Sequence, residues 1–130
     1  MVGTLGVTGT DTSGQNMAAQ FKYIEGSVED AITATASGSQ TTSYQLTAQV
    51  SRISTVATTA DGVKLPLAVP GMALTVINDG ANAAQVFPTA PDTIDAVTSA
   101  TGVALSAAKR ATFFCVVAGK WQSMLGAVST

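Results

Sequence analysis

Short runs of alternating apolar and polar residues, separated by turn-forming residues, dominate most of the chain. Residues 45–50 alternate, and the pattern continues through residues 52–57, with Ile53 and Val56 on the apolar side. A period of two is typical of a half-buried β-strand, and the abundant Thr residues suit the pleated surface of a sheet. The pattern therefore predicts strands over both stretches.

Two further pairs of strands are predicted in the second half of the chain. Residues 72–78 and 83–88 flank the turn signal Asp-Gly-Ala-Asn, which indicates a first hairpin. Residues 109–117 and 120–125 flank Ala-Gly, which indicates a second hairpin. Gly, Asn and Asp favour these assignments because they adopt the backbone angles of tight turns at little cost.

Helical patterns are short and ambiguous in this sequence. Residues 100–111 have a helical composition, but their length and flanking turns favour a strand, a loop and a second strand. Residues 15–30 place Met17, Phe21 and Ile24 at helical spacing, yet they also alternate tolerably as a strand. We favour strand or loop there, because the rest of the chain is of β type. An α/β fold would need repeated amphipathic helices, and the pattern contains none.

These elements predict an all-β fold: a compact small β-sandwich or barrel-like module with few or no helices. Residues 1–13 are rich in Gly and Thr, so we expect an extended N-terminal arm. We assign residues 1–40 to the arm and its linking strands, and residues 41–130 to a β-rich knob that also serves oligomerisation. The predicted core consists of Leu65, Leu74, Val76, Val86, Phe87, Phe114, Val116, Trp121 and Leu125.

The low content of charged residues bears on which partners the chain can bind. At 130 residues the chain is long enough for one domain with a small core. Charged residues make up 11 %, against about a quarter in an average soluble domain. Few charges are available to protect exposed sheet edges, which favours an oligomer over a monomer of ordinary solubility. The net charge is −2 and the six cationic residues are scattered, so we expect no nucleic-acid partner.

The sequence lacks the residue types that most catalytic and metal-binding sites require. The chain has no His and a single Cys, which excludes Ser-His-Asp and Cys-His nucleophile systems, thiolate metal cages and an internal disulfide. We expect Cys115 to be a small buried residue, and we expect no enzymatic activity, metal or cofactor. No secretory signal and no apolar run of about 18 residues occurs, so we expect a soluble chain without a membrane partner.

Two groups of carboxylates are candidate sites. Glu25, Glu29 and Asp30 form the densest group, but they lack the alternating acidic pattern of a calcium loop and fit a solvated edge better. Asp92 and Asp95 could pair for glycoside hydrolysis if they lay close together. Positions three apart on a strand point to opposite faces, so we interpret both as turn residues.

Several consecutive segments resemble a recurrent module of tailed-bacteriophage virion proteins. They are "DGVKLP", "VINDGANAAQVFP", "DTIDAVTSATGVALSAAKRATFF" and "AGKWQSML", and the match spans about half of the chain. The resemblance implies a structural protein of the head exterior or of a fibre, commonly a homotrimer.

The first functional expectation is therefore a non-enzymatic head decoration (cement) protein or short head fibre. It would bind the major capsid protein on the outer surface of the capsid after synthesis in the host cytoplasm, and it would stabilise the capsid lattice. The arm is the expected attachment segment. Its candidate capsid-binding residues are Leu5, Val7, Phe21 and Tyr23.

The alternative is the receptor- or glycan-binding tip of a phage head or tail fibre. In that case loops such as Asp79–Asn82 and Pro91–Ala96 would face a bacterial surface glycan. Trp121 with Phe113, Phe114 and Tyr44 could supply a stacking platform for a sugar, although a single Trp opposite an aromatic strand is more often a core or interface anchor. The sequence has no long repetitive shaft, which favours decoration.

Overall fold

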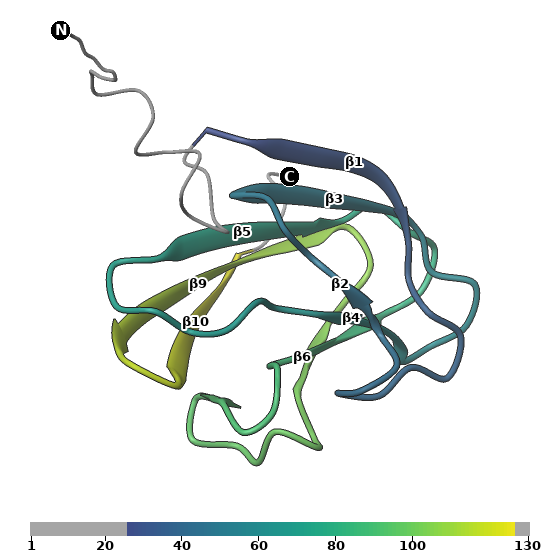
Figure 1. The fold of residues 1–130 in the computed structure, drawn as a ribbon. Coiled ribbons are helices and arrows are strands. Elements are labelled where there is room, and N and C mark those ends of the chain that lie inside the picture. Colours follow the sequence, from purple (N-terminus) through teal and green to yellow (C-terminus); the bar gives the residue numbers. More distant parts are fainter. Residues whose placement is uncertain (1–25, 127–130) are drawn as a thin grey trace, which may run out of the picture.

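The structure, a computed structural model, describes residues 26–126, and this part of the chain contains strands and no helix (Figure 1). The predicted all-β class is confirmed. The strands are β1 (Val28–Thr33), β2 (Tyr44–Gln45), β3 (Val50–Thr55), β4 (Asp61–Lys64), β5 (Ala73–Asn78), β6 (Ala84–Phe87), β7 (Thr93–Ile94), β8 (Val103–Leu105), β9 (Lys109–Val117) and β10 (Lys120–Gly126).

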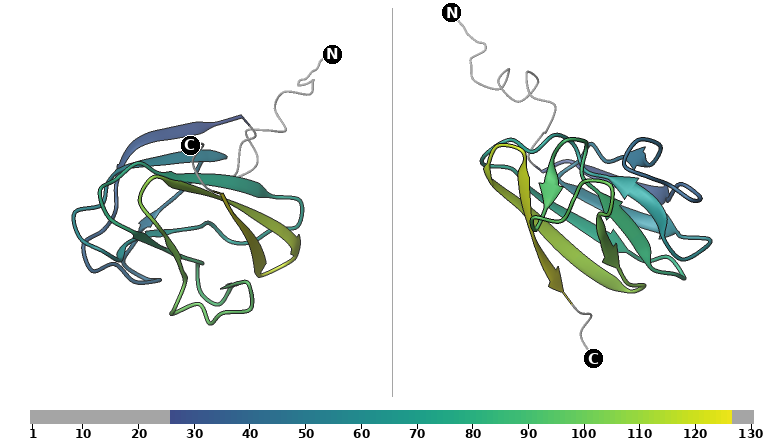
Figure 2. Two further views of the ribbon diagram at one scale, coloured as in Figure 1. Left: turned by 180° about the vertical axis from the view of Figure 1, so that it is seen from behind. Right: turned by 90° about the horizontal axis from the view of Figure 1, so that it is seen from below.

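The strands form two stacked sheets, and the chain changes sheet after each strand from β1 to β8 (Figures 1 and 2). One sheet has six strands in the order β1-β3-β5-β9-β10-β7, and the other has four in the order β2-β4-β6-β8. Strands β1, β3 and β5 are parallel, as are β2, β4 and β6. The chain therefore winds as a solenoid-like stack and ends in antiparallel strands.

The predicted hairpin of residues 72–78 and 83–88 is wrong, because β5 and β6 lie in different sheets. Asn78, at the end of β5, is fully buried. Its amide nitrogen donates to the carbonyl oxygens of Asn82 and Leu105, both at 2.9 Å, and its oxygen accepts the Gly80 N–H at 2.9 Å. These bonds direct the chain across to the second sheet.

The predicted second hairpin is confirmed. Strands β9 and β10 pair antiparallel, with Gly126 opposite Arg110 and Lys120 opposite Val117. Residues 100–111 form a strand, a loop and the start of a second strand, as the turn signals predicted.

The core lies between the facing sides of the two sheets. Of the predicted core, Leu65, Leu74, Val76, Val86, Phe87 and Trp121 are buried. The assignments of Phe114, Val116 and Leu125 are wrong, since their exposed fractions are 37, 71 and 59 %.

The error in β9 follows from its alternation. Ala111, Phe113 and Cys115 point inward and are buried, so Phe114 and Val116 between and beyond them face outward. Cys115 is buried as predicted. Its burial raises the pKa of the thiol, which keeps the sulfur protonated at neutral pH.

The arm assigned to residues 1–40 lies largely outside the described residues. Strand β1 belongs to that segment and pairs in parallel with β3, so residues 28–33 are part of the six-stranded sheet. The boundary after residue 40 stays a prediction.

Trp121 should be a main contributor to stability, because it is 1 % exposed and lies opposite Cys115 in the hairpin. We expect Trp121→Ala to lower the free energy of unfolding by about 3–5 kcal/mol, as aromatic truncations in cores do. Denaturant unfolding measures this loss. Gln122→Ala, at the exposed neighbouring position, is the control and should change the value by less than about 0.5 kcal/mol. A loss below about 1 kcal/mol for Trp121→Ala would contradict its place in the core.

Asp61 should make the stability depend on pH. Hydrogen bonds from the Thr58 N–H and hydroxyl, with a further bond from the Ser37 N–H, hold the pKa of this carboxyl below its usual value of 3.8. Its stabilisation is therefore complete above that value and is lost as the pH falls through the lower pKa of the folded state. When unfolding is measured at a series of acidic pH values, the free energy of unfolding of Asp61→Asn should depend less on pH than that of the parent chain. Equal slopes of unfolding free energy against pH for the variant and the parent would show that these bonds do not stabilise the carboxylate.

Candidate interaction surface

Of the carboxylates singled out in the sequence, Glu29 and Asp30 form structural bonds, and Glu25 lies outside the described residues. Arg52 forms ion pairs with Asp30 at 2.8 Å and with Asp79 at 2.7 Å on the outside of the six-stranded sheet. The hydrogen bond from Arg52 lowers the pKa of Asp30. Glu29 accepts hydrogen bonds from the Tyr44 hydroxyl and the Thr47 N–H, and the bond to Glu29 raises the pKa of Tyr44.

Asp92 and Asp95 also bind backbone groups, on either side of β7. Asp92 is buried, and its carboxylate accepts the Ala68 N–H at 2.7 Å. Asp95 accepts the Ser123 N–H at 2.8 Å and the Ser123 hydroxyl. Within residues 26–126, no group of three or more His, Cys, Asp and Glu side chains could hold a metal ion. The described side chains thus form no catalytic or metal constellation.

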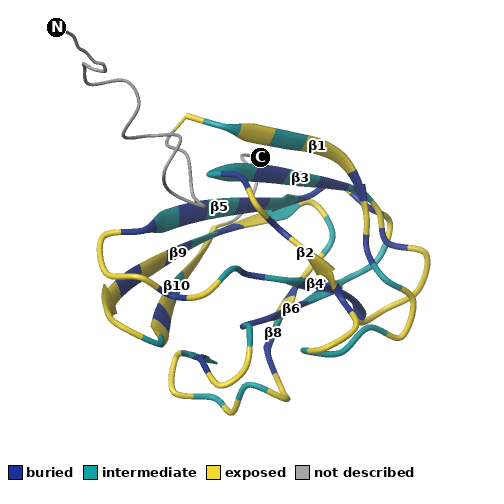
Figure 3. Cartoon of the chain, in the orientation of Figure 1, coloured by how far each residue is buried: buried dark blue, intermediate teal, exposed yellow. Residues whose placement is uncertain are grey.

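Exposed aliphatic residues occur at the turn end of the β9–β10 hairpin, which Figure 3 colours largely as exposed. We call this group the apolar tip. Val116 and Val117 end β9, with exposed fractions of 71 and 55 %, and Leu67 and Val69 come from the connection between β4 and β5. Leu67 and Val69 are exposed to a similar degree. These four exposed aliphatic side chains make the apolar tip a candidate interaction surface.

Backbone hydrogen bonds hold the two parts of the tip together. The Gly119 N–H, in the hairpin turn, donates to the Ala68 carbonyl at 3.1 Å, and the Gly71 N–H donates to the Cys115 carbonyl at 2.8 Å. Ala68 is buried and anchored by Asp92, so its neighbours Leu67 and Val69 point outward. These hydrogen bonds therefore fix the backbone that carries the tip.

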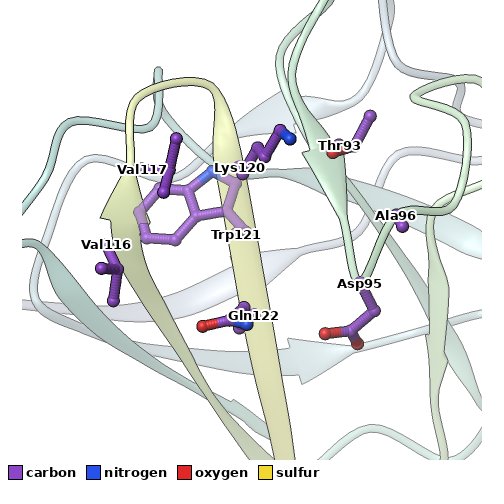
Figure 4. A pocket seen from close by; sticks show the side chains of 8 residues that line it. All are labelled: Thr93, Asp95, Ala96, Val116, Val117, Lys120, Trp121 and Gln122. Carbon is purple, nitrogen blue, oxygen red and sulfur yellow. The ribbon is translucent and has the colours of Figure 1, made fainter.

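A hollow of about 510 Å³ lies beside the tip, between the hairpin and the segment around β7 (Figure 4). In the view of Figure 4 the indole of Trp121 is seen across the β9–β10 hairpin, and Thr93, Asp95 and Ala96 lie on the other side of β10. The hollow is lined by Thr93, Asp95, Ala96, Val116, Val117, Lys120, Trp121 and Gln122. Because Trp121 is almost fully buried, its ring is not free to stack on a sugar.

The loop Asp79–Asn82, the other candidate glycan loop, is engaged in holding the fold. The Asn82 amide nitrogen donates to the Val56 carbonyl at 2.9 Å and to the Ala57 carbonyl at 3.0 Å, and Asp79 pairs with Arg52. The Asn82 amide nitrogen and one carboxylate oxygen of Asp79 are therefore already partnered by the protein. Only the segment Pro91–Ala96 borders the hollow, through Thr93, Asp95 and Ala96.

The sequence reasoning missed the apolar tip. Its signals were present: Leu67 and Val69 stand between Pro66 and Pro70, which interrupt strand pairing, and the two valines directly precede a turn. The candidate capsid-binding residues lie outside the described residues. They are Leu5, Val7, Phe21 and Tyr23.

Within the part of the chain described here, no helix has the length and apolar character of a membrane span. Comparison with protein-family models, with curated proteins and with solved structures finds no match to this chain. The resemblance to phage virion proteins therefore stays a prediction.

Proposed function

We propose that this chain is a non-enzymatic structural protein that binds the outside of a bacteriophage head and stabilises the lattice of its major capsid protein. The observation that carries the proposal is the apolar tip, a rigidly held contact surface. The resemblance in sequence supplies the choice of partner. In this proposal the two-sheet stack is the compact sandwich-like module expected from the sequence.

The chemistry of the tip suits association with another protein. The centres of protein interfaces are apolar and poor in charged residues, and the four aliphatic side chains of the tip meet that description. A single tip is smaller than a standard interface and would bind weakly by itself. Repetition over a capsid, with several contacts for each oligomer, would convert weak contacts into stable attachment.

The described groups give little support to an enzyme. The thiol of Cys115 is buried with a raised pKa, so it is a poor nucleophile. The carboxylates of Asp61, Asp92 and Asp95 each accept a backbone N–H bond, which gives them structural roles. A contact function needs none of these groups to react.

The glycan-binding alternative is weakened by the arrangement of the aromatic residues. Trp121 is buried in the hairpin, while the exposed Tyr44 and Phe114 belong to different sheets. Residues 26–126 therefore present no paired aromatic platform on which a sugar ring could stack. The hollow beside Pro91–Ala96 is the remaining feature on which that alternative could rest.

Substitution of the tip tests the proposal. The quadruple change of Leu67, Val69, Val116 and Val117 to Ser should lower co-sedimentation with capsids that lack the protein by at least about tenfold, because it removes apolar contact area. The matched control is Val28→Ser, since Val28 is also 71 % exposed but lies on β1, at the opposite edge of the sheet.

The same assay separates the tip from the arm. Unchanged binding of the quadruple variant would contradict a contact at the tip. If deletion of Met1–Ser13 alone abolished binding, attachment would belong to the arm expected from the sequence. If the parent chain ignored capsids but adhered to bacterial cells, the protein would be a receptor-binding tip.

A further inference from the structure

The six-stranded sheet has one face in the core and one face without a covering layer. The four-stranded sheet packs against the first face (Figure 1). Within residues 26–126, no helix and no further sheet lies on the other face, which we call the outer face. On β5, Leu74 and Val76 are buried, so Thr75 and Ile77 between and beyond them belong to the outer face.

The strand registers align five outward side chains in one row across the outer face. Val28 of β1 lies beside Val50 of β3, which lies beside Thr75 of β5. Thr75 lies beside Thr112 of β9, which lies beside Met124 of β10. The two end residues, Val28 and Met124, are 71 and 62 % exposed. Strand β5 is therefore the middle of an uncharged row that is apolar at both ends.

The rows on either side of this one differ in charge. One of them is also uncharged and consists of Ala73, Phe114 and Gln122. The other consists of Arg52 of β3, Ile77 of β5 and Arg110 of β9. Among these three rows, charged side chains are thus confined to the strands that flank β5, at the level of Ile77.

The two sides of the charged row carry opposite net charge. Arg52 forms ion pairs with both Asp30 and Asp79, so this group carries one excess negative charge, and all three side chains reach solvent. Arg110 is exposed and forms no ion pair within residues 26–126. An excess carboxylate thus lies on one side of β5 and an unpaired cation on the other.

We infer that the outer face binds the outer face of a second copy of this chain, with a two-fold axis along β5. This axis exchanges the two sides of the sheet and keeps each row at its level, so β3 of one copy meets β9 of the other. Arg110 of each copy then lies over the carboxylates that surround Arg52 in the other copy. Val28 lies over Met124, and Thr75 meets its own counterpart. The inference does not depend on capsid binding.

The charges select this axis over the other two-fold arrangement of the same faces. An axis across the strands, through the row of Thr75, would place Arg110 over Phe114 of the other copy and leave its charge unpaired. Complementary charges fix the register of an interface more than they add to its affinity. Sheets packed face to face stand about 10 Å apart with their strands nearly aligned, which suits an axis along β5.

The area of the outer face sets the expected strength of the contact. Five strands about 4.8 Å apart and three rows about 6.8 Å apart span roughly 500 Å² in projection. Monomers rarely leave apolar patches larger than a few hundred Å² exposed. A standard interface buries about 800 Å² on each partner, so we expect a weak dimer with a Kd of roughly 10–100 µM. This differs from the trimer that the sequence resemblance implies.

Sedimentation equilibrium of the full chain tests the inference. Between about 10 µM and 1 mM, the mass should rise from the 13.0 kDa of one chain towards twice that value. Arg110→Glu should raise the dissociation constant at least about tenfold, because it places like charges together. The matched control is Lys109→Glu, the same change of charge on the opposite face of β9, beside the buried Asn78. A parent that stays monomeric, a trimeric parent, or equal effects of the two variants would overturn the inference.

A second variant keeps the test decisive if Arg110→Glu fails to fold. Oxidised glutathione should link two copies of Thr75→Cys through a disulfide, because this position lies on the axis, whereas the native Cys115 is buried and should not react. Ala104→Cys, at an exposed position on β8 of the other sheet, is the control and should stay monomeric on non-reducing electrophoresis. Equal yields of covalent dimer would contradict the contact. A Thr75→Cys monomer whose thiol resists a maleimide would overturn it and assign the outer face to another segment of the same chain.

Discussion

The buried amide of Asn78 fixes the path on which the rest of the fold depends. Its three hydrogen bonds join the end of β5, the crossing segment and the end of β8. An unpaired buried amide would cost about 1–3 kcal/mol, so the native path is favoured over any path that leaves these groups without partners. The close approach of Gly80 to Val56, where a Cβ would come within 2.7 Å, requires the absence of a side chain at the crossing.

This crossing determines which surfaces the molecule displays. With β6 in the second sheet, the place beside β5 is taken by β9, which pairs with it from Ala73 opposite Phe114 to Asn78 opposite Lys109. The hairpin β9–β10 therefore carries the apolar tip at its turn and the uncovered Leu125 at its other end.

The sequence predicted the features that depend on neighbouring residues. The all-β class, the β9–β10 hairpin and the burial of Trp121 follow from alternation and turn residues within short windows. The crossing after β5 could not be predicted in this way, because Asp-Gly-Ala-Asn fits a hairpin equally well. The deciding partner of Asn78, Leu105, lies 27 residues away.

The surface was harder to predict than the core for a related reason. Residues 113–117 are apolar without interruption, so their pattern does not show which side faces inward. The packing of Phe113 and Cys115 under the second sheet settles this and leaves Val116 outside. Leu125 has the alternation of a core residue, yet its exposed fraction is 59 %.

Hydrogen–deuterium exchange of the full chain, free and bound to capsids that lack it, tests the central claim most directly. The claim is that a rigid two-sheet scaffold meets its partner through the apolar tip. The account predicts slower exchange on binding at residues 67–69 and 116–119, with little change in β1. Slower exchange confined to the loop Asp79–Asn82 or to residues 1–25, with the tip unchanged, would contradict it.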